Sequence, residues 1–330
     1  MCGRLFIMRT CWMLVAVMGL CAIITKRSRG AMSEFDMIQR YFYPLAQGHE
    51  AVRGFQSDTA ALQVPDGQQI VLTTDTLNEG VHFFKNTNPV IIAQKALRSN
   101  LSDVMAGGGD PLCYQLAVAF SSAPDSGWLS AFTAALKTDQ DALGLFCSGG
   151  DTTSVKGGLS ITITMIGLQP RGKGITRAGA QDGDAIIVTG ALGEGCSAYQ
   201  RGETIAPPRH HKDMAAVVRA YANAAVDISD GLLADIGHVA QASLMDAALD
   251  LDAIPISDCD PMQAIVGGDD YHIALSVPRD KTAQCLRALQ EIGAHPAIIG
   301  HFVKGRGQIS LLGDAGEELE LPKKQGWQHF

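Results

Sequence analysis

Alternation between strand-like and helix-like segments is the feature that most limits what this chain can fold into. Residues 160–166 (SITITMI) carry apolar side chains at every second position, which predicts a strand with one buried face. Residues 128–143 instead place Leu129, Phe132 and Leu136 on one side of a helix. Segments of both kinds follow one another from Met32 onward, so the pattern predicts a mixed α/β (α+β) protein.

The remaining elements can be placed from caps and apolar runs. Asn88 and Pro89 supply an N-cap and a first helical residue, and this helix is expected to stop at residues 107–109 (GGG). Ser33 and Asp36 form the capping box of an earlier helix. Further strands are expected over residues 69–74, 113–120, 145–148, 185–189 and 273–277, and further helices over residues 214–221, 232–241 and 281–292.

The expected elements fall into two halves that meet at residues 171–174 (RGKG). We therefore expect an N-terminal domain over residues 32–169 and a C-terminal domain over residues 170–330. Residues 1–31 are a leader of doubtful status, with an apolar run at residues 11–24 between basic residues. The run is short for a membrane span of about 20 residues, and no A-x-A cleavage site follows it. A translation start at Met32 is the favoured interpretation, and a genuine membrane or export segment is the alternative.

Composition excludes several classes of protein. The chain of 330 residues is 46% hydrophobic with a formal net charge of -8, and it has no basic stretch with interleaved aromatic residues. Nucleic acid is therefore not an expected partner. Eight cysteines occur without a Cys-x-x-Cys pair, which favours scattered thiols in a reducing, cytoplasmic compartment over a zinc site or a disulfide framework.

Familiar phosphate-binding motifs are missing. No Walker A sequence occurs, and residues 189–195 (TGALGEG) do not match G-x-G-x-x-G, so they are interpreted mainly as a strand-to-helix turn with phosphate contact as the alternative. His210 and His211 follow two prolines and are expected in a solvated loop.

Aspartates at strand ends and turns are the main chemical signal. The set consists of Asp58, Asp75, Asp103, Asp151, Asp227 and Asp230. A single aspartate of this kind is usually a turn or capping residue, and Asp230 could simply cap the helix that follows it. As a set beside Ser, Thr and Gly, they offer the hard oxygen ligands that Mg²⁺ shares with substrate phosphates. Phosphoryl transfer depends mostly on such positioning and charge stabilisation, so the set is chemically coherent with a magnesium-dependent kinase.

Longer segments resemble a known family. TTDTLNEGVHF, KALRSNLSDVMAGGGDP, GGDTT, VDISDGLLAD, GGDDY and the terminal GWQHF are similar, in this order, to the thiamine-monophosphate kinases of the aminoimidazole ribonucleotide synthetase-like superfamily. The resemblance implies two α/β domains and a homodimer whose N-terminal domains form a barrel across both subunits. It also implies ATP-dependent phosphorylation of thiamine monophosphate to thiamine diphosphate, by direct in-line transfer without a covalent protein nucleophile.

The resemblance also implies residue roles. Several Mg²⁺ ions would be held by Asp58, Thr73, Thr74, Asp75, Asp103, Asp151, Asp227 and Asp230. ATP, the co-substrate, would contact Gly150, Asp151, Arg177 and Ser229. Thiamine monophosphate would contact His82, Asp269 and Trp327.

The chain departs from the family pattern at a few positions. Ser57 stands where an aspartate is usual, Asp269 and His272 where glutamates are common, and Gln328 where an aspartate is common. Two alternatives therefore stay open: another ATP-dependent synthetase of the superfamily, and a degenerate nucleotide-binding protein without catalysis. A membrane-tethered form applies if residues 1–31 are genuine.

Overall fold

The computed structural model describes residues 32–257 and 259–328. Helix α2 (Glu34–Met37) begins at Ser33, whose hydroxyl accepts from the Asp36 amide, so the predicted capping box is confirmed. A π-helical turn, η1 (Ile38–Phe42), follows. The chain divides into two units after Arg40, and residues from Tyr41 onward form the second, compact unit. The expectations for residues 1–31 lie outside the described residues.

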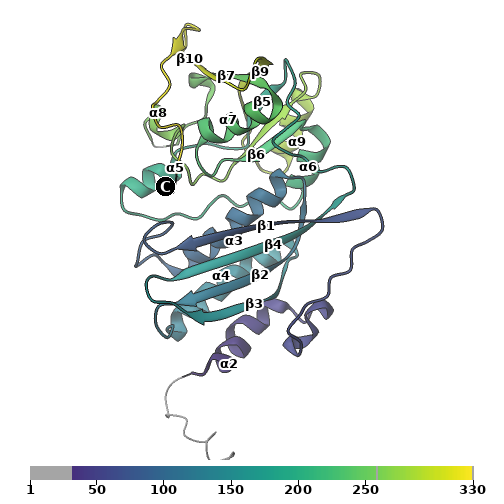
Figure 1. The fold of residues 1–330 in the computed structure, drawn as a ribbon, viewed down its shortest axis with the longest axis vertical. Coiled ribbons are helices and arrows are strands. Elements are labelled where there is room, and N and C mark those ends of the chain that lie inside the picture. Colours follow the sequence, from purple (N-terminus) through teal and green to yellow (C-terminus); the bar gives the residue numbers. More distant parts are fainter. Residues whose placement is uncertain (1–31, 258, 329–330) are drawn as a thin grey trace, which may run out of the picture. The chain divides into compact units, whose positions relative to one another are not determined.

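A four-stranded N-terminal sheet has the order β1-β4-β2-β3 (Figure 1). Its strands are β1 (Gln68–Asn78), β2 (Asp110–Phe120), β3 (Phe146–Ser154) and β4 (Ser160–Pro170). β1, β4 and β2 pair antiparallel, whereas β2 and β3 pair parallel. Within the described residues this sheet is open, and they form no closed barrel.

The two faces of the N-terminal sheet differ in burial. Ile161, Ile163 and Met165 of β4 are fully buried, as the period-two pattern predicted, and helix α3 (Pro89–Ala106) packs on this side of the sheet. The opposite face carries exposed residues such as Leu72, whose exposed fraction is 67%. β1 and β3 run further than predicted because their polar residues lie within paired strands and do not end them.

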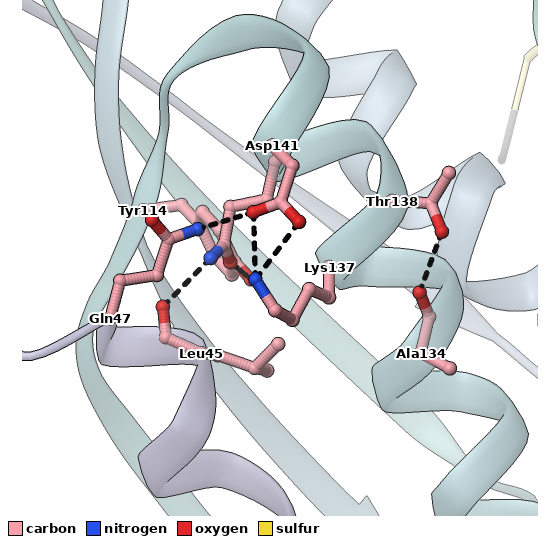
Figure 2. Close-up of polar contacts among 8 residues, drawn as sticks. Leu45, Gln47, Tyr114, Ala134, Lys137, Thr138 and Asp141 are labelled. Atoms are coloured by element: carbon pink, nitrogen blue, oxygen red, sulfur yellow. Dashed lines mark hydrogen bonds and ion pairs between the residues drawn. The ribbon is translucent and has the colours of Figure 1, made fainter.

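Helix α4 (Ser126–Leu143) packs against α3 and anchors the short helical turn η2 (Tyr43–Ala46). The buried Gln140 amide donates to the Leu45 carbonyl at 2.9 Å and accepts from the Tyr114 hydroxyl at 2.8 Å. At the surface, Lys137 and Gln47 both donate to Asp141 (Figure 2). A second turn, η3 (Glu50–Phe55), contacts β3 and η2.

The C-terminal half contains a seven-stranded sheet of order β11-β10-β7-β9-β5-β8-β6. Its strands are β5 (Ala185–Val188), β6 (Ala224–Asp227), β7 (Met245–Asp250), β8 (Ile273–Val277), β9 (Ala297–Lys304), β10 (Ile309–Leu312) and β11 (Glu318–Leu319). The helices of this half are α5 (Glu194–Gln200), α6 (Met214–Tyr221), α7 (Leu232–Ser243), α8 (Pro261–Ala264) and α9 (Thr282–Glu291), with the turn η4 (Leu251–Ala253). Apolar residues from β5, α7 and β9, among them Ile186, Leu232 and Phe302, form its buried core.

Helix α3 contacts both sheets, because it packs on β1, β4 and β2 and also touches β6, β8 and α6. Asn88 caps its N-terminus and Gly107 its C-terminus, as predicted. The next residue, Gly108, has a φ of 73°, and a Cβ there would lie 2.8 Å from the Arg219 side chain. The chain can therefore turn here into β2 because glycine adopts this backbone conformation without strain.

Predicted elements with strong caps or long apolar stripes are confirmed, including α3, α4, α6, α7, β8 and α9. The short strands β7, β9, β10 and β11 were not predicted, since their pairing depends on segments far away in the chain. The expected solvated loop is wrong for His210, whose exposed fraction is 6%. Across residues 32–257 and 259–328, no helix combines the length and apolar character that a membrane crossing requires.

Candidate active site

A buried polar stripe on α3 organises the candidate site. Lys95, Ser99 and Ser102 lie four and three residues apart, which places them on one side of the helix. All three are buried, although polar side chains are mostly exposed in proteins. Each of the three contacts a carboxylate from another element, so acidic residues of several elements lie along one side of this helix.

Three aspartates and a threonine converge beside this stripe. Asp103 of α3 accepts from the Thr73 hydroxyl of β1 at 2.8 Å. Asp227, at the end of β6, accepts from the Ser102 hydroxyl at 2.7 Å and also bonds to Asp103. Asp75 of β1 interacts with Ser99 and with Asp103. The structure therefore brings together Thr73, Asp75, Asp103 and Asp227, which we call the acidic cluster.

The electrostatics of the acidic cluster are unfavourable to several negative charges at once. Burial, and then the Asp103 carboxylate, raise the pKa of Asp75 to about 6. Burial also raises the pKa of Asp103, against the lowering influence of Thr73, Asp227 and Arg177. The pKa of Asp227 is raised well above its ordinary value by burial and by Asp103. These directions indicate negative charge that the described side chains do not fully compensate.

The turn between β6 and α7 borders the acidic cluster. One carboxylate oxygen of Asp235 accepts from the amides of Ser229, Asp230 and Gly231, each at 3.1 Å. This clamp fixes the turn that carries two predicted site residues, Ser229 and Asp230. Burial and the Asp230 charge raise the pKa of Asp235 to about 7. The guanidinium of Arg177 acts on both Asp103 and Asp235, so it also lies near the cluster.

Other predicted residues lie elsewhere. Thr74 points to the uncovered face of the N-terminal sheet, where its hydroxyl bonds to Thr164 at 2.9 Å. Asp151 is exposed on β3 and lies opposite Ala117 of β2 in the parallel pairing of these strands. It therefore faces the same side of the sheet as Thr74. Asp58 is exposed in the segment between η3 and β1. The structure does not bring these three residues to the acidic cluster.

Gly150 occupies a position that only glycine fits. It lies on β3 next to Leu116 of β2, and a Cβ at Gly150 would collide with the Leu116 carbonyl.

A small cavity, of about 20 Å³, adjoins the N-terminal part of α3. Its lining includes His82, Lys95, Asp269 and the aromatic residues Phe84 and Tyr199, whose ring centroids are 5.5 Å apart. The cavity therefore joins two of the three residues predicted to contact the substrate. The third, Trp327, donates its amide to the Asp230 carbonyl at 2.8 Å, and its ring lies under Lys324 at 5.0 Å.

Close backbone contacts explain the glycines beside Asp269. The Asp269 amide donates to the Ser229 carbonyl at 2.9 Å. A Cβ at Gly268 would collide with that same carbonyl, and one at Gly195 would lie 2.6 Å from the Asp269 carbonyl oxygen. The segment GGDDY therefore packs backbone to backbone against the β6–α7 turn, which brings the cavity close to the acidic cluster.

The glycine-rich segment at residues 189–195 is the predicted turn, between β5 and α5. The Asp270 carboxylate accepts from the Gly193 amide at 3.0 Å and from the Gly195 amide at 3.4 Å. Burial raises the pKa of Asp270 to about 7. Because this carboxylate already occupies the two amides, the segment offers them to no phosphate.

The chemistry of the acidic cluster fits a divalent cation. Carboxylate and hydroxyl oxygens are the ligands that Mg²⁺ prefers, and a cation would offset the charge that raises the pKa of each aspartate there. Within residues 32–257 and 259–328, however, no three His, Cys, Asp or Glu side chains converge closely enough to hold an ion. Binding therefore requires side-chain rearrangement or oxygens from a substrate phosphate.

Sequence reasoning missed the residues that support this site. Lys95, Ser99, Asn100, Ser102 and Asp235 all hold predicted site residues by hydrogen bonds or ion pairs. The one available signal was the polar stripe on a helix that its apolar residues mark as buried, since polar residues on a buried face need specific partners.

Known proteins match nearly the whole chain. The N-terminal domain of AIR synthase related proteins matches residues 56–169, and their C-terminal domain matches residues 181–312. The thiamine-monophosphate kinase of Caulobacter vibrioides is 33% identical over 322 residues, which cover 90% of this chain and 91% of that protein.

Two solved structures are similar over comparable lengths. The thiamine-monophosphate kinase from Stenotrophomonas maltophilia has a TM-score of 0.76 at 31% identity and covers 87% of this chain and 98% of its own. AaThiL, complexed with AMPPCP and TMP, has a TM-score of 0.67 at 26% identity and covers 93% of this chain and 99% of its own. The two-domain α/β fold and these similarities together lead to one assignment: this chain belongs to the thiamine-monophosphate kinase family.

Proposed function

We propose that this protein transfers the γ-phosphoryl group of ATP to the phosphate of thiamine monophosphate, giving thiamine diphosphate and ADP. The observation that carries the proposal is the convergence of Asp75, Asp103 and Asp227 from three separate elements, next to a cavity lined by His82 and Asp269. Its relatives of similar length are named as thiamine-monophosphate kinases, and one was solved with AMPPCP and TMP.

The acidic cluster is the proposed site of Mg²⁺. Thr73, Asp75, Asp103 and Asp227 would hold the ion, with Asp230 from the adjoining turn. Mg²⁺ held there would supply positive charge to offset the negative charge of the phosphate groups. The residues themselves supply oxygen ligands, and the Asp235 clamp keeps the Asp230 backbone fixed while phosphate groups enter.

The remaining roles extend this proposal. Arg177, near Asp103, is suited to hold phosphate oxygens because its planar guanidinium makes paired hydrogen bonds. Ser229, Gly150 and Asp151 are proposed nucleotide contacts. Asp269 and the Trp327 ring are proposed contacts of the cationic thiazolium ring, which both a carboxylate and an indole face attract. An acceptor phosphate is already ionised at neutral pH, so no protein nucleophile is required.

Residues away from the acidic cluster fit a role in a homodimer. Thr74 and Asp151 lie on the uncovered face of the N-terminal sheet, together with Ile70 and Leu72, whose exposed fractions are 42% and 67%. An exposed apolar sheet face favours association with a second copy. A dimer-spanning barrel formed by two such sheets remains the proposed assembly, and Asp58 and Asp151 would complete metal sites within it.

Two further assignments belong to the proposal. We place the boundary between an ATP- and Mg²⁺-binding N-terminal domain and the C-terminal domain at residues 169/170, one residue before the end of β4 at Pro170. A cytoplasmic location follows from the need for ATP as a substrate.

Purified protein mixed with ATP, Mg²⁺ and thiamine monophosphate tests the function. Chromatography of the thiamine species should reveal thiamine diphosphate, and its formation should require both ATP and Mg²⁺. ADP release without thiamine diphosphate would indicate another acceptor, as in another synthetase of the superfamily. Nucleotide binding without turnover would favour a degenerate binding protein, for which Ser57 and Asp269 are the motivating features.

A further inference from the structure

Lys95 is a buried lysine in the lining of the cavity beside α3. Its exposed fraction is 2%, and lysine is almost never buried to this extent without a partner. The Nζ atom forms an ion pair with Oδ2 of Asp269, a residue 174 positions away in the chain. Both residues line the small cavity beside α3.

The two partners differ sharply in exposure. The Lys95 side chain is 3% exposed, whereas the Asp269 side chain is 32% exposed. Removing charges from water is costly, so a purely structural buried pair needs further hydrogen bonds that satisfy both partners. Here the ammonium is enclosed and the carboxylate stays open to the cavity. This arrangement is expected when the carboxylate also binds a ligand.

Asp269 is held from more than one side. Its carboxylate also interacts with the hydroxyl of Tyr271, which is itself buried. Its backbone has a φ of 76°, an unusual conformation for a residue with a side chain, and its amide is fixed by Ser229. The backbone and the side chain of Asp269 are thus both held in place. Lys95 is the residue of α3 that holds the side chain.

Helix α3 ties this ion pair to the acidic cluster. Lys95 and Asp103 lie eight residues apart on the same helix, which corresponds to about 12 Å along its axis. A rigid helix therefore fixes the spacing between the cavity and the carboxylates that face the phosphate groups.

We propose that Lys95 is a positioning residue for thiamine monophosphate, acting through Asp269: its buried ammonium holds the Asp269 carboxylate in the orientation that receives the cationic part of the substrate. The inference rests on the proposed function, because it assumes that this cavity receives thiamine monophosphate. Lys95 itself contacts no substrate in this arrangement. Its effect is specific to the thiamine side and does not extend to the nucleotide.

Equilibrium binding tests the proposal without requiring turnover. Dissociation constants for thiamine monophosphate and for Mg²⁺–ATP are measured separately by calorimetry on the full chain, in the wild type and in K95M, D269N and the double variant. The exposed Lys137, which pairs with Asp141 on α4, gives the matched control K137M.

We expect K95M and D269N each to weaken binding of thiamine monophosphate about tenfold or more, because each removes a group that fixes a charged hydrogen bond. The double variant should bind like D269N within about twofold, since Lys95 has nothing to position once the carboxylate is gone. Binding of Mg²⁺–ATP should stay within about twofold throughout, and K137M should match the wild type.

Several outcomes overturn the proposal. If the loss of affinity for thiamine monophosphate in the double variant equals the product of the two single losses, Lys95 acts on the substrate independently of Asp269. Tighter binding by K95M would mean that Lys95 only screens the carboxylate. Equal losses for both ligands would indicate a structural role. If K95M does not fold, K95Q replaces it, and unchanged binding of thiamine monophosphate by K95M or K95Q would contradict a positioning role.

The outcome is separable from that of the proposed function. A wild type that binds thiamine monophosphate but forms no thiamine diphosphate would refute the proposed function. The dissociation constants of the two single variants and the double variant would still test the role of Lys95. A wild type that does not bind thiamine monophosphate would overturn the inference itself.

Discussion

Buried His210 should make the stability of this protein depend on pH in a way that a single substitution reveals. Burial lowers the pKa of His210 to about 4, and the Arg98 charge adds to this lowering, against the hydrogen bond to the Tyr271 carbonyl. The Nε2 atom lies 3.0 Å from that carbonyl oxygen, so the neutral ring donates there. In the unfolded chain the ordinary pKa is about 6.5.

The direction in which stability changes with pH follows from proton binding. Between pH 6.5 and 4 the unfolded chain binds a proton at this histidine and the folded protein does not, so stability falls as the pH falls through this window. The two pKa values imply a loss of about 2 kcal/mol between pH 7 and pH 5. Buried carboxylates titrate in the same range, so the effect of His210 is isolated as a difference between a variant and the wild type.

The substitution His210→Gln keeps a donor for the Tyr271 carbonyl and removes the titration. Urea unfolding at pH 7 and pH 5 should show the stability advantage of the wild type over this variant shrinking by about 2 kcal/mol. The neighbouring His211 is exposed and gives the control His211→Gln, which leaves His210 in place and should follow the wild type. Parallel losses of stability in His210→Gln and the wild type would refute the reasoning.

Three further outcomes can be checked with the same protein. Asp103→Asn removes a carboxylate from the acidic cluster and should lower formation of thiamine diphosphate at least about 100-fold with little change in melting temperature, whereas Asp141→Asn at the surface should match the wild type in both assays. Gln140→Leu leaves both buried partners of the amide unpaired and should lower the free energy of unfolding in urea by about 3 kcal/mol; a loss below about 0.5 kcal/mol would contradict it. Leu72→Lys on the uncovered sheet face should shift light scattering toward a monomer, while Leu244→Lys, at an equally exposed leucine that follows α7, should not; a monomeric wild type would rule out the proposed dimer.

Much of the fold was predictable because it depends on local signals. The capping box at Ser33, the Asn88–Pro89 start of α3 and the period-two pattern of β4 each act within a few residues, and each is confirmed. The strands β7, β9 and β10 were missed since they are short and are stabilised by pairing with distant segments. His210 was misplaced because only the packed structure encloses its loop.

The candidate site divides in the same way. Asp75, Asp103 and Asp227 could be selected from the sequence as carboxylates beside strands and helix turns, and the family resemblance added Thr73. Their convergence could not be predicted from spacing, because it depends on α3 packing against both sheets. The opposite orientations of Thr73 and Thr74 are likewise a consequence of the strand pleat and of which face α3 covers.

By itself, the sequence determined the family, the alternating α/β elements and the residue types available for magnesium and phosphate chemistry. The tertiary structure decided which of those residues meet, and it added supporting residues such as Lys95 and Asp235. The physical reason is that caps and periodicity are short-range properties of the chain. The position of a buried charge is instead set by partners from distant elements, since a lysine inside a protein is stable only where a carboxylate has been brought to it.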